Sequence, residues 1–232
     1  MVKIIIQARV GSSRLPGKVL MKNRNKTMLE IMVERVNESK YADVIVATTN
    51  NPKDDKIVEI CKKNKIQYFR GDENNVLSRY YILSSLFPKE HIVRLTSDCP
   101  LMDPKLLDKV IDYHFYKSAG FTTNVFPRTF PDGLDIEIFA PDILGDVYKK
   151  VDRLAEHERT KHQEHVTSYI YDYPTKFEIN NFLCDINLSY LRWTLDTLED
   201  FNYVSYIFDN LGKESFIFNT DEILDFLDNG GK

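Results

Sequence analysis

The chain has 232 residues, a net charge of −4 at pH 7, 43% hydrophobic and 28% charged residues, and three widely spaced cysteines. Its acidic balance argues against a protein that binds nucleic acid or anionic membranes, because both usually carry a basic excess. Its apolar runs are shorter than the roughly 18–20 residues that span a bilayer, and the cysteines fit neither a disulfide framework nor a zinc motif. We expect a single cytoplasmic domain over residues 1–232.

In the first half of the chain, short apolar runs alternate with amphipathic segments. The runs predict strands because they are rich in β-branched residues, and the segments predict helices because their apolar residues recur at helical spacing. Asp103 and Pro104 suit the N-cap and first turn of a helix. The predicted strands are 3–8, 44–49, 67–70 and 92–96, and the predicted helices are 28–38, 54–64, 75–85 and 104–116.

This alternation predicts an α/β fold with a mostly parallel sheet that helices cover on both faces. Ligands bind beyond the carboxyl ends of the strands in such sheets. The second half is less regular, and we interpret it as containing an inserted arm within about residues 125–190. Strands are predicted there at 120–124, 135–139 and 176–179, and one helix at 152–171.

The first predicted strand leads into QARVGSSRLPGK at residues 7–18, which combines Arg9, Arg14 and Lys18 with Gly11 and Gly17. Glycines let a backbone approach a phosphate closely, and arginines donate paired hydrogen bonds to phosphate oxygens. The glycine spacing differs from that of a Walker A loop, and no G-x-G-x-x-G motif supports a dinucleotide fold. The stretch predicts a polyphosphate cradle, with a plain solvated loop as the alternative.

Two aspartates stand at the ends of apolar stretches. Asp98 follows the strand 92–96, where it could hold Mg²⁺ together with substrate phosphates or could cap the next turn. Asp196 ends the stretch RWTLD. Its position alone favours the N-cap of a helix that starts at Leu198, with Glu199 completing a capping box, over a metal ligand.

Other polar side chains leave alternatives open. Asp135 and Glu137 point to the same side of a predicted strand, where they could bind sugar hydroxyls or a cation, or form a solvated face. His157 and His162 lie five residues apart on a predicted helix. That spacing turns them about 140° away from each other, which does not fit the paired histidine ligands of a zinc hydrolase.

Several stretches together resemble the cytidylyltransferase-like family of SpsF-type spore coat polysaccharide biosynthesis proteins. That family is related to the acylneuraminate and 3-deoxy-manno-octulosonate cytidylyltransferases. The stretches keep the same order over most of the chain: QARVGSSRLPGKVL at 7–20, LTSDCPLMDP at 95–104, FPDGLDIEIF at 130–139, QEHVTSYIY at 163–171 and RWTLDTLEDF at 192–201. The resemblance implies a glycosyltransferase-A-like nucleotidyltransferase fold and a homodimer. It implies transfer of CMP from CTP to an acidic sugar or a phosphorylated acceptor, with Mg²⁺ and release of pyrophosphate.

The resemblance also implies roles for individual residues. Arg14 and Lys18 would bind the triphosphate and, with Asp98, act as catalytic residues. Asp98 and Asp196 would hold the metal, which favours the metal-ligand interpretation of Asp196. The nucleotide would contact Gln7, Ala8, Arg9, Gly11, Ser12, Arg14, Lys18 and Asp98. Our own hypothesis for the mechanism adds Asp135, Glu137 and His165 as candidates for contacts with the acceptor.

Two functions of other classes remain as alternatives. A glycosyltransferase of the same architecture usually holds its metal with an Asp-x-Asp pair, whereas Cys99 and Pro100 follow Asp98 here. That difference favours nucleotidyl transfer. A non-catalytic nucleotide-binding module would have no need for both Asp98 and Asp196 beside a cationic loop.

Overall fold

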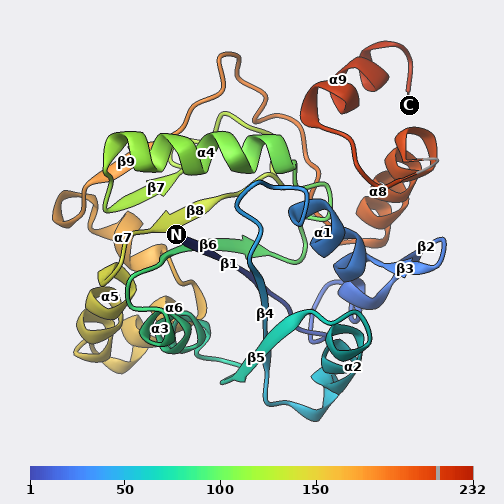
Figure 1. Ribbon diagram of the computed structural model, residues 1–232. Coiled ribbons are helices and arrows are strands. Elements are labelled where there is room, and N and C mark those ends of the chain that lie inside the picture. Colours follow the sequence, from blue (N-terminus) through green and yellow to red (C-terminus); the bar gives the residue numbers. More distant parts are fainter. Residues whose placement is uncertain (213–214, 232) are drawn as a thin grey trace.

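The computed structural model describes residues 1–212 and 215–231, and a seven-stranded sheet forms its centre (Figure 1). The sheet has the order β5-β4-β1-β6-β8-β7-β9. Neighbouring strands are parallel, except that β8 runs antiparallel to β6 and β7. The mostly parallel sheet predicted from the sequence is therefore confirmed. The strands are β1 (Val2–Gln7), β4 (Val44–Thr49), β5 (Gln67–Gly71), β6 (His91–Thr96), β7 (Phe121–Thr123), β8 (Glu137–Phe139) and β9 (Ile179–Asn181).

Helices cover both faces of the sheet (Figure 1). One core lies between the sheet and α1, α2, α4 and α8, and the other lies beneath α3, α5 and α7. A two-stranded ribbon, β2 (Lys22–Asn23) and β3 (Lys26–Thr27), precedes the first helix. The helices are α1 (Met28–Val36), α2 (Asp55–Lys63), α3 (Val76–Leu86), α4 (Pro104–Lys117), α5 (Ile143–Asp152), α6 (Glu156–Glu164), α7 (Ser168–Asp172), α8 (Leu198–Leu211) and α9 (Thr220–Asp228).

The central strand β1 is apolar on both sides because both sides are covered. Ile4 and Ile6 pack into one core and Ile5 packs into the other, and all three are fully buried. Successive side chains of a strand point to opposite faces. A strand that is buried on both faces therefore has a continuous apolar run instead of alternation.

The strands and helices predicted for the first half are confirmed to within two residues at each end. The predicted N-cap of α4 is also confirmed. The Asp103 carboxylate accepts a hydrogen bond from the Lys105 backbone N–H at 2.8 Å, and Pro104 occupies the first helical position. The same carboxylate binds the backbone N–H and hydroxyl of Thr220, which ties the start of α9 to the start of α4.

The single helix predicted at 152–171 is wrong. The chain forms the end of α5, then α6, and then the short α7. His165 leaves the helical conformation, with φ −105° and ψ 89°, and the turn buries Val166 in the core beneath α3. Burial of that apolar side chain thus interrupts the helix, and His165 is left exposed at the turn.

The segment 125–190, predicted to contain an arm, contributes both to the sheet and to its cover. The strand predicted at 135–139 starts two residues later, at Glu137, and the strand predicted at 176–179 is instead β9 at Ile179–Asn181. A long extended connection then runs from β9 to α8 along one edge of the molecule (Figure 1). Among the described residues, no helix has the length and apolar character needed to cross a bilayer.

Candidate active site

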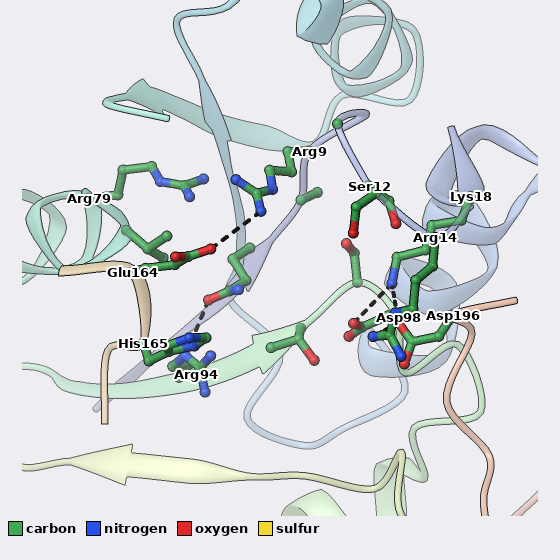
Figure 2. A pocket seen from close by; sticks show the side chains of 17 residues that line it. Arg9, Ser12, Arg14, Lys18, Arg79, Arg94, Asp98, Glu164, His165 and Asp196 are labelled. Carbon is green, nitrogen blue, oxygen red and sulfur yellow. Dashed lines mark hydrogen bonds and ion pairs between the residues drawn. The ribbon is translucent and has the colours of Figure 1, made fainter. Parts of the chain in front are cut away.

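A pocket of about 300 Å³ opens beyond the carboxyl ends of β1 and β6 (Figure 2). This is the edge of a parallel sheet at which ligands bind, and the volume lies at the small end of the range for ligand sites. All the residues that the sequence predicts to bind nucleotide line it. The lining residues are Gln7, Ala8, Arg9, Gly11, Ser12, Ser13, Arg14, Lys18, Val76, Arg79, Arg94, Thr96, Ser97, Asp98, Glu164, His165 and Asp196.

The loop after β1 is held in shape by its own backbone and by Asp54. The Val10 carbonyl accepts hydrogen bonds from the backbone N–H groups of Ser12 and Gly17, both at 2.9 Å. Gly17 has φ +76°, a left-handed conformation that favours glycine. The Val10 N–H donates to the buried Asp54 carboxylate at 2.7 Å, and the Thr49 hydroxyl donates to its other oxygen. The loop therefore closes on itself and brings Lys18 back toward the strand ends.

The Lys18 ammonium joins the two predicted metal ligands. Lys18 Nζ lies 3.1 Å from Asp98 Oδ2 and 2.9 Å from Asp196 Oδ1. Arg14 Nη2 lies 2.9 Å from the same Asp196 oxygen. Lys18 is 8% exposed, and the two carboxylates pair its buried ammonium group. The structure thus brings together all four charged residues that the sequence assigns to the triphosphate and the metal.

Asp196 is not the N-cap of α8, which was the alternative that its position favoured. Thr197 is the N-cap and forms a capping box with Asp200, whose carboxylate also accepts the Asp196 backbone N–H at 2.8 Å. This leaves the Asp196 carboxylate free to bind Lys18, Arg14 and Arg192. Burial acts to raise the pKa of Asp196, but the hydrogen bonds from Lys18 and Arg192 outweigh it and lower the pKa below its ordinary value.

The position of Asp196 depends on a close backbone contact. The chain at Trp193 passes against Gly133, where a Cβ atom would lie 2.6 Å from the Trp193 carbonyl carbon. The Trp193 N–H donates to the Asp132 carbonyl, and the Leu195 N–H donates to the Asp98 carbonyl at 2.7 Å. The last bond links the segment that carries one aspartate to the backbone of the other.

The pocket has a second cationic end, away from Lys18. Figure 2 shows Arg9, Arg79, Arg94, Glu164 and His165 there, with Arg14, Lys18, Asp98 and Asp196 on the opposite side. Arg9 Nη2 lies 3.8 Å from Glu164 Oε1, and Arg94 pairs with Glu137. Arg79 and Arg94 also line the pocket, and neither is among the site residues predicted from the sequence. Arg94 sits in the middle of the apolar run IVRLT, and such a charge within a buried strand was an available signal.

Two predicted acceptor residues lie outside the pocket lining, whereas His165 lines it. Glu137 is 3% exposed and is occupied by Arg94 and by the Tyr171 hydroxyl. Asp135 precedes β8 and forms a two-fold hydrogen bond with the Arg128 guanidinium. Both carboxylates are therefore committed to arginines, and Glu137 acts on the pocket through Arg94.

Asp98 and Asp196 fit a divalent cation that a nucleotide also coordinates. Their oxygens already converge on one cationic atom, Lys18 Nζ. No cluster of three or more His, Cys, Asp or Glu side chains suited to a metal occurs within residues 1–212 and 215–231. One or two carboxylates completed by substrate phosphates is the way in which proteins usually bind Mg²⁺.

The fold and the pocket define the class of nucleotide-sugar transferase-like α/β enzymes. The chain belongs to the cytidylyltransferase family, whose model matches residues 3–232. It is 32% identical to the spore coat polysaccharide biosynthesis protein SpsF of Bacillus subtilis, over 90% of this chain and 87% of SpsF.

Solved structures of other proteins support this family assignment. A cytidylyltransferase from Leptospira borgpetersenii superposes with a TM-score of 0.91 at 36% identity, over 98% of this chain and 94% of that chain. A CMP:2-keto-3-deoxy-manno-octonic acid synthetase complexed with CTP superposes with a TM-score of 0.68, over 91% of this chain and all of that chain. At 16% identity, the second likeness shows the shared fold.

Proposed function

We propose that the protein transfers CMP from CTP to an acidic sugar, uses Mg²⁺ and releases pyrophosphate. The observation that carries this proposal is the convergence of Asp98 and Asp196 on Lys18, beside Arg14 and a glycine-containing loop. Cations on a loop stabilise phosphates, and paired carboxylates suit a metal that phosphates also coordinate. The structural likeness to a synthetase complexed with CTP supports the choice of nucleotide.

Asp98 and Asp196 would hold Mg²⁺, and the bound ion would supply positive charge to the phosphates. The acceptor oxygen would attack the α-phosphorus as the bond to pyrophosphate breaks. Lys18 and Arg14, which form ion pairs with the two aspartates, would then stabilise the charge on the departing pyrophosphate. The chain contributes position and charge, and no covalent intermediate is required.

We propose that the acceptor is a sugar acid used in glycan synthesis and that His165 contacts it. His165 is exposed at the break between α6 and α7 and lines the pocket. Glu137 and Asp135 would act on the acceptor indirectly, because each is bound to an arginine. The likeness to a protein of spore coat polysaccharide biosynthesis supports a polysaccharide precursor as the product.

We further propose that the protein is a cytoplasmic homodimer and that the segment 125–190 carries the dimer contact. Phe126, Leu183, Ile186 and Tyr190 all lie in this segment and are between 43% and 76% exposed. Large apolar side chains exposed in one region are typical of a protein interface. The molar mass in solution, measured by light scattering, tests this arrangement.

Nucleotide binding followed by product formation tests the proposed function. The melting temperature is measured with CTP, UTP, GTP and ATP, with and without Mg²⁺, and with UDP- and GDP-sugars. A ligand that binds only the folded protein raises it. We expect an Mg²⁺-dependent rise with CTP, and then pyrophosphate release when sugar acids are added. A rise with nucleotide sugars alone would favour a glycosyltransferase, and CTP binding without turnover on any acceptor would favour a binding module.

A further inference from the structure

Two arginines are almost completely buried, and they differ in their partners. Arg35, on α1, is fully buried and donates to the backbone carbonyls of Leu101, Met102, Phe216 and Phe218. Its guanidinium also lies 4.3 Å from the centre of the Phe218 ring. Arg35 is thus a structural arginine, with its donors satisfied by the protein.

Arg79, on α3, is 2% exposed but has far fewer partners. Its Nη1 donates to the Ala47 carbonyl at 3.2 Å, and its Nε has no hydrogen-bond partner. Within the described part of the chain, no carboxylate forms an ion pair with it. The Ala47 carbonyl also accepts the Ala8 N–H at 3.0 Å, so this carbonyl does not depend on Arg79.

The surroundings of Arg79 are shaped to hold it at the pocket. Gly71 leaves room for its side chain, since a Cβ atom there would lie 2.6 Å from Arg79 Cγ. Arg79 lines the pocket at the end away from Lys18 (Figure 2). Burial lowers the pKa of Arg79, and the nearby Arg9 lowers it further.

A buried charge without a partner destabilises a protein, and proteins normally pair such charges. Arg79 instead has an unpaired donor and a place in the wall of a ligand pocket. We propose that Arg79 is a ligand-contacting residue that binds an acceptor-only group, either the sugar carboxylate or the carbonyl edge of the pyrimidine. This proposal rests on the proposed function, which supplies both groups.

Gln7 adds a second donor at this end of the pocket. Its Oε1 accepts from the Tyr80 hydroxyl at 3.3 Å and from Arg94 Nε at 3.2 Å. These bonds fix the amide and leave its NH₂ group to donate to a ligand. A group with two acceptors and no donor would satisfy Gln7 and Arg79 together, whereas a group that presents a donor would meet another donor.

The substitutions Arg79→Met and Arg35→Met test the proposal, because methionine replaces the apolar stem of the arginine side chain and removes its charge and its donors. Arg35→Met should lower the melting temperature by roughly 10 °C, since buried carbonyls lose their donors. Arg79→Met should leave the melting temperature unchanged or raise it, because the substitution removes a buried charge without an ion-pair partner. A fall as large as that of Arg35→Met would identify Arg79 as structural and overturn the proposal.

Calorimetric titration with three probes then locates the contact. The probes are CTP, tripolyphosphate and 3-deoxy-manno-octulosonate, added to wild type and Arg79→Met. We expect a loss of roughly 10- to 100-fold for one ligand group. A loss for CTP but not tripolyphosphate assigns Arg79 to the nucleoside, and a loss for the sugar acid alone assigns it to the acceptor.

Two outcomes would overturn the proposal on binding grounds. One is unchanged affinity for all three probes. The other is an equal loss for CTP and tripolyphosphate, which would reflect only the general positive charge of the pocket. A wild-type protein that bound no CTP would instead overturn the proposed function, and the two melting temperatures would still decide whether Arg79 is structural.

Discussion

Lys18 and Asp196 are 178 residues apart in the chain, and their side chains meet at 2.9 Å in the wall of the pocket. The contact joins the loop after β1 to the segment before α8. Lys18 also reaches Asp98, so that one ammonium occupies the place where two carboxylates converge. Lys18 and Arg14, which we propose to bind phosphates, therefore neutralise the two aspartates that we propose to hold a metal.

The first prediction concerns metal binding without nucleotide. Lys18→Met should raise the affinity of the free protein for Mn²⁺ by about 10-fold, because it removes a positive charge from the two carboxylates. The same substitution should weaken CTP binding. Electron paramagnetic resonance counts free Mn²⁺ directly and needs no turnover. Lys26→Met is the matched control, because Lys26 pairs with Glu34 outside the pocket; equal Mn²⁺ affinity in wild type and Lys18→Met would contradict the prediction.

The second prediction separates catalysis from stability at Asp98. Asp98→Asn should lower the rate of pyrophosphate release by about 100-fold or more, because the amide keeps the shape but loses the charge. The melting temperature should change little, since Lys18 keeps its bond to Asp196. Asp112→Asn, on the exposed face of α4, provides the control. Full activity of Asp98→Asn would remove Asp98 from the metal site.

The third prediction concerns the close contact that positions Asp196. Gly133 has φ +116° and lies against the Trp193 backbone. Gly133→Ala should destabilise the protein by about 3 kcal/mol, because the added Cβ strains the backbone and displaces the segment around Trp193. It should also lower activity, because that segment carries Asp196. Gly230→Ala shares a positive φ but meets nothing within 4 Å, and it should cost only about 1 kcal/mol. Urea unfolding measures both values, and similar losses for the two variants would show that the contact is unimportant.

The fourth prediction is a loss of stability in mild acid. Burial, reinforced by His91, lowers the pKa of His114 to about 4, whereas an unfolded histidine has a pKa of about 6.5. The unfolded chain therefore binds a proton at a pH where the folded protein does not. The stability contributed by neutral His114 is complete above pH 6.5 and is lost as the pH falls toward 4, by about 3 kcal/mol in total.

Urea unfolding at pH 7 and pH 4.5 measures this effect. His114→Gln should be less stable than wild type at pH 7, because His91 and Thr122 lose the ring nitrogens of His114 as hydrogen-bond partners. Its stability should nevertheless fall less than that of wild type between the two pH values. Parallel losses in the two proteins would show that His114 does not titrate as expected.

Local chemistry was enough to predict the first half of the fold. The β-branched runs of β1, β4 and β6 and the Asp103-Pro104 helix start depend on neighbours in sequence, so that their pattern specifies the elements directly. Because parallel strands present their carboxyl ends at one edge of the sheet, the sequence also predicts that the loop 7–18 and Asp98 lie at the same edge. In the structure both line one pocket.

Contacts between distant segments decided the features that the sequence pattern did not predict. Asp196 pairs with Lys18 from 178 residues away, whereas sequence spacing favoured Asp196 as the helix cap that Thr197 forms with Asp200. The burial of Val166 interrupts the single helix that the sequence pattern predicted over residues 152–171. Arg79 lies at the pocket with its guanidinium bound to the Ala47 carbonyl of β4, 32 residues away in the chain. Each outcome depends on which surfaces pack together and exclude water. Local sequence patterns do not specify those contacts, and only the tertiary structure decides them.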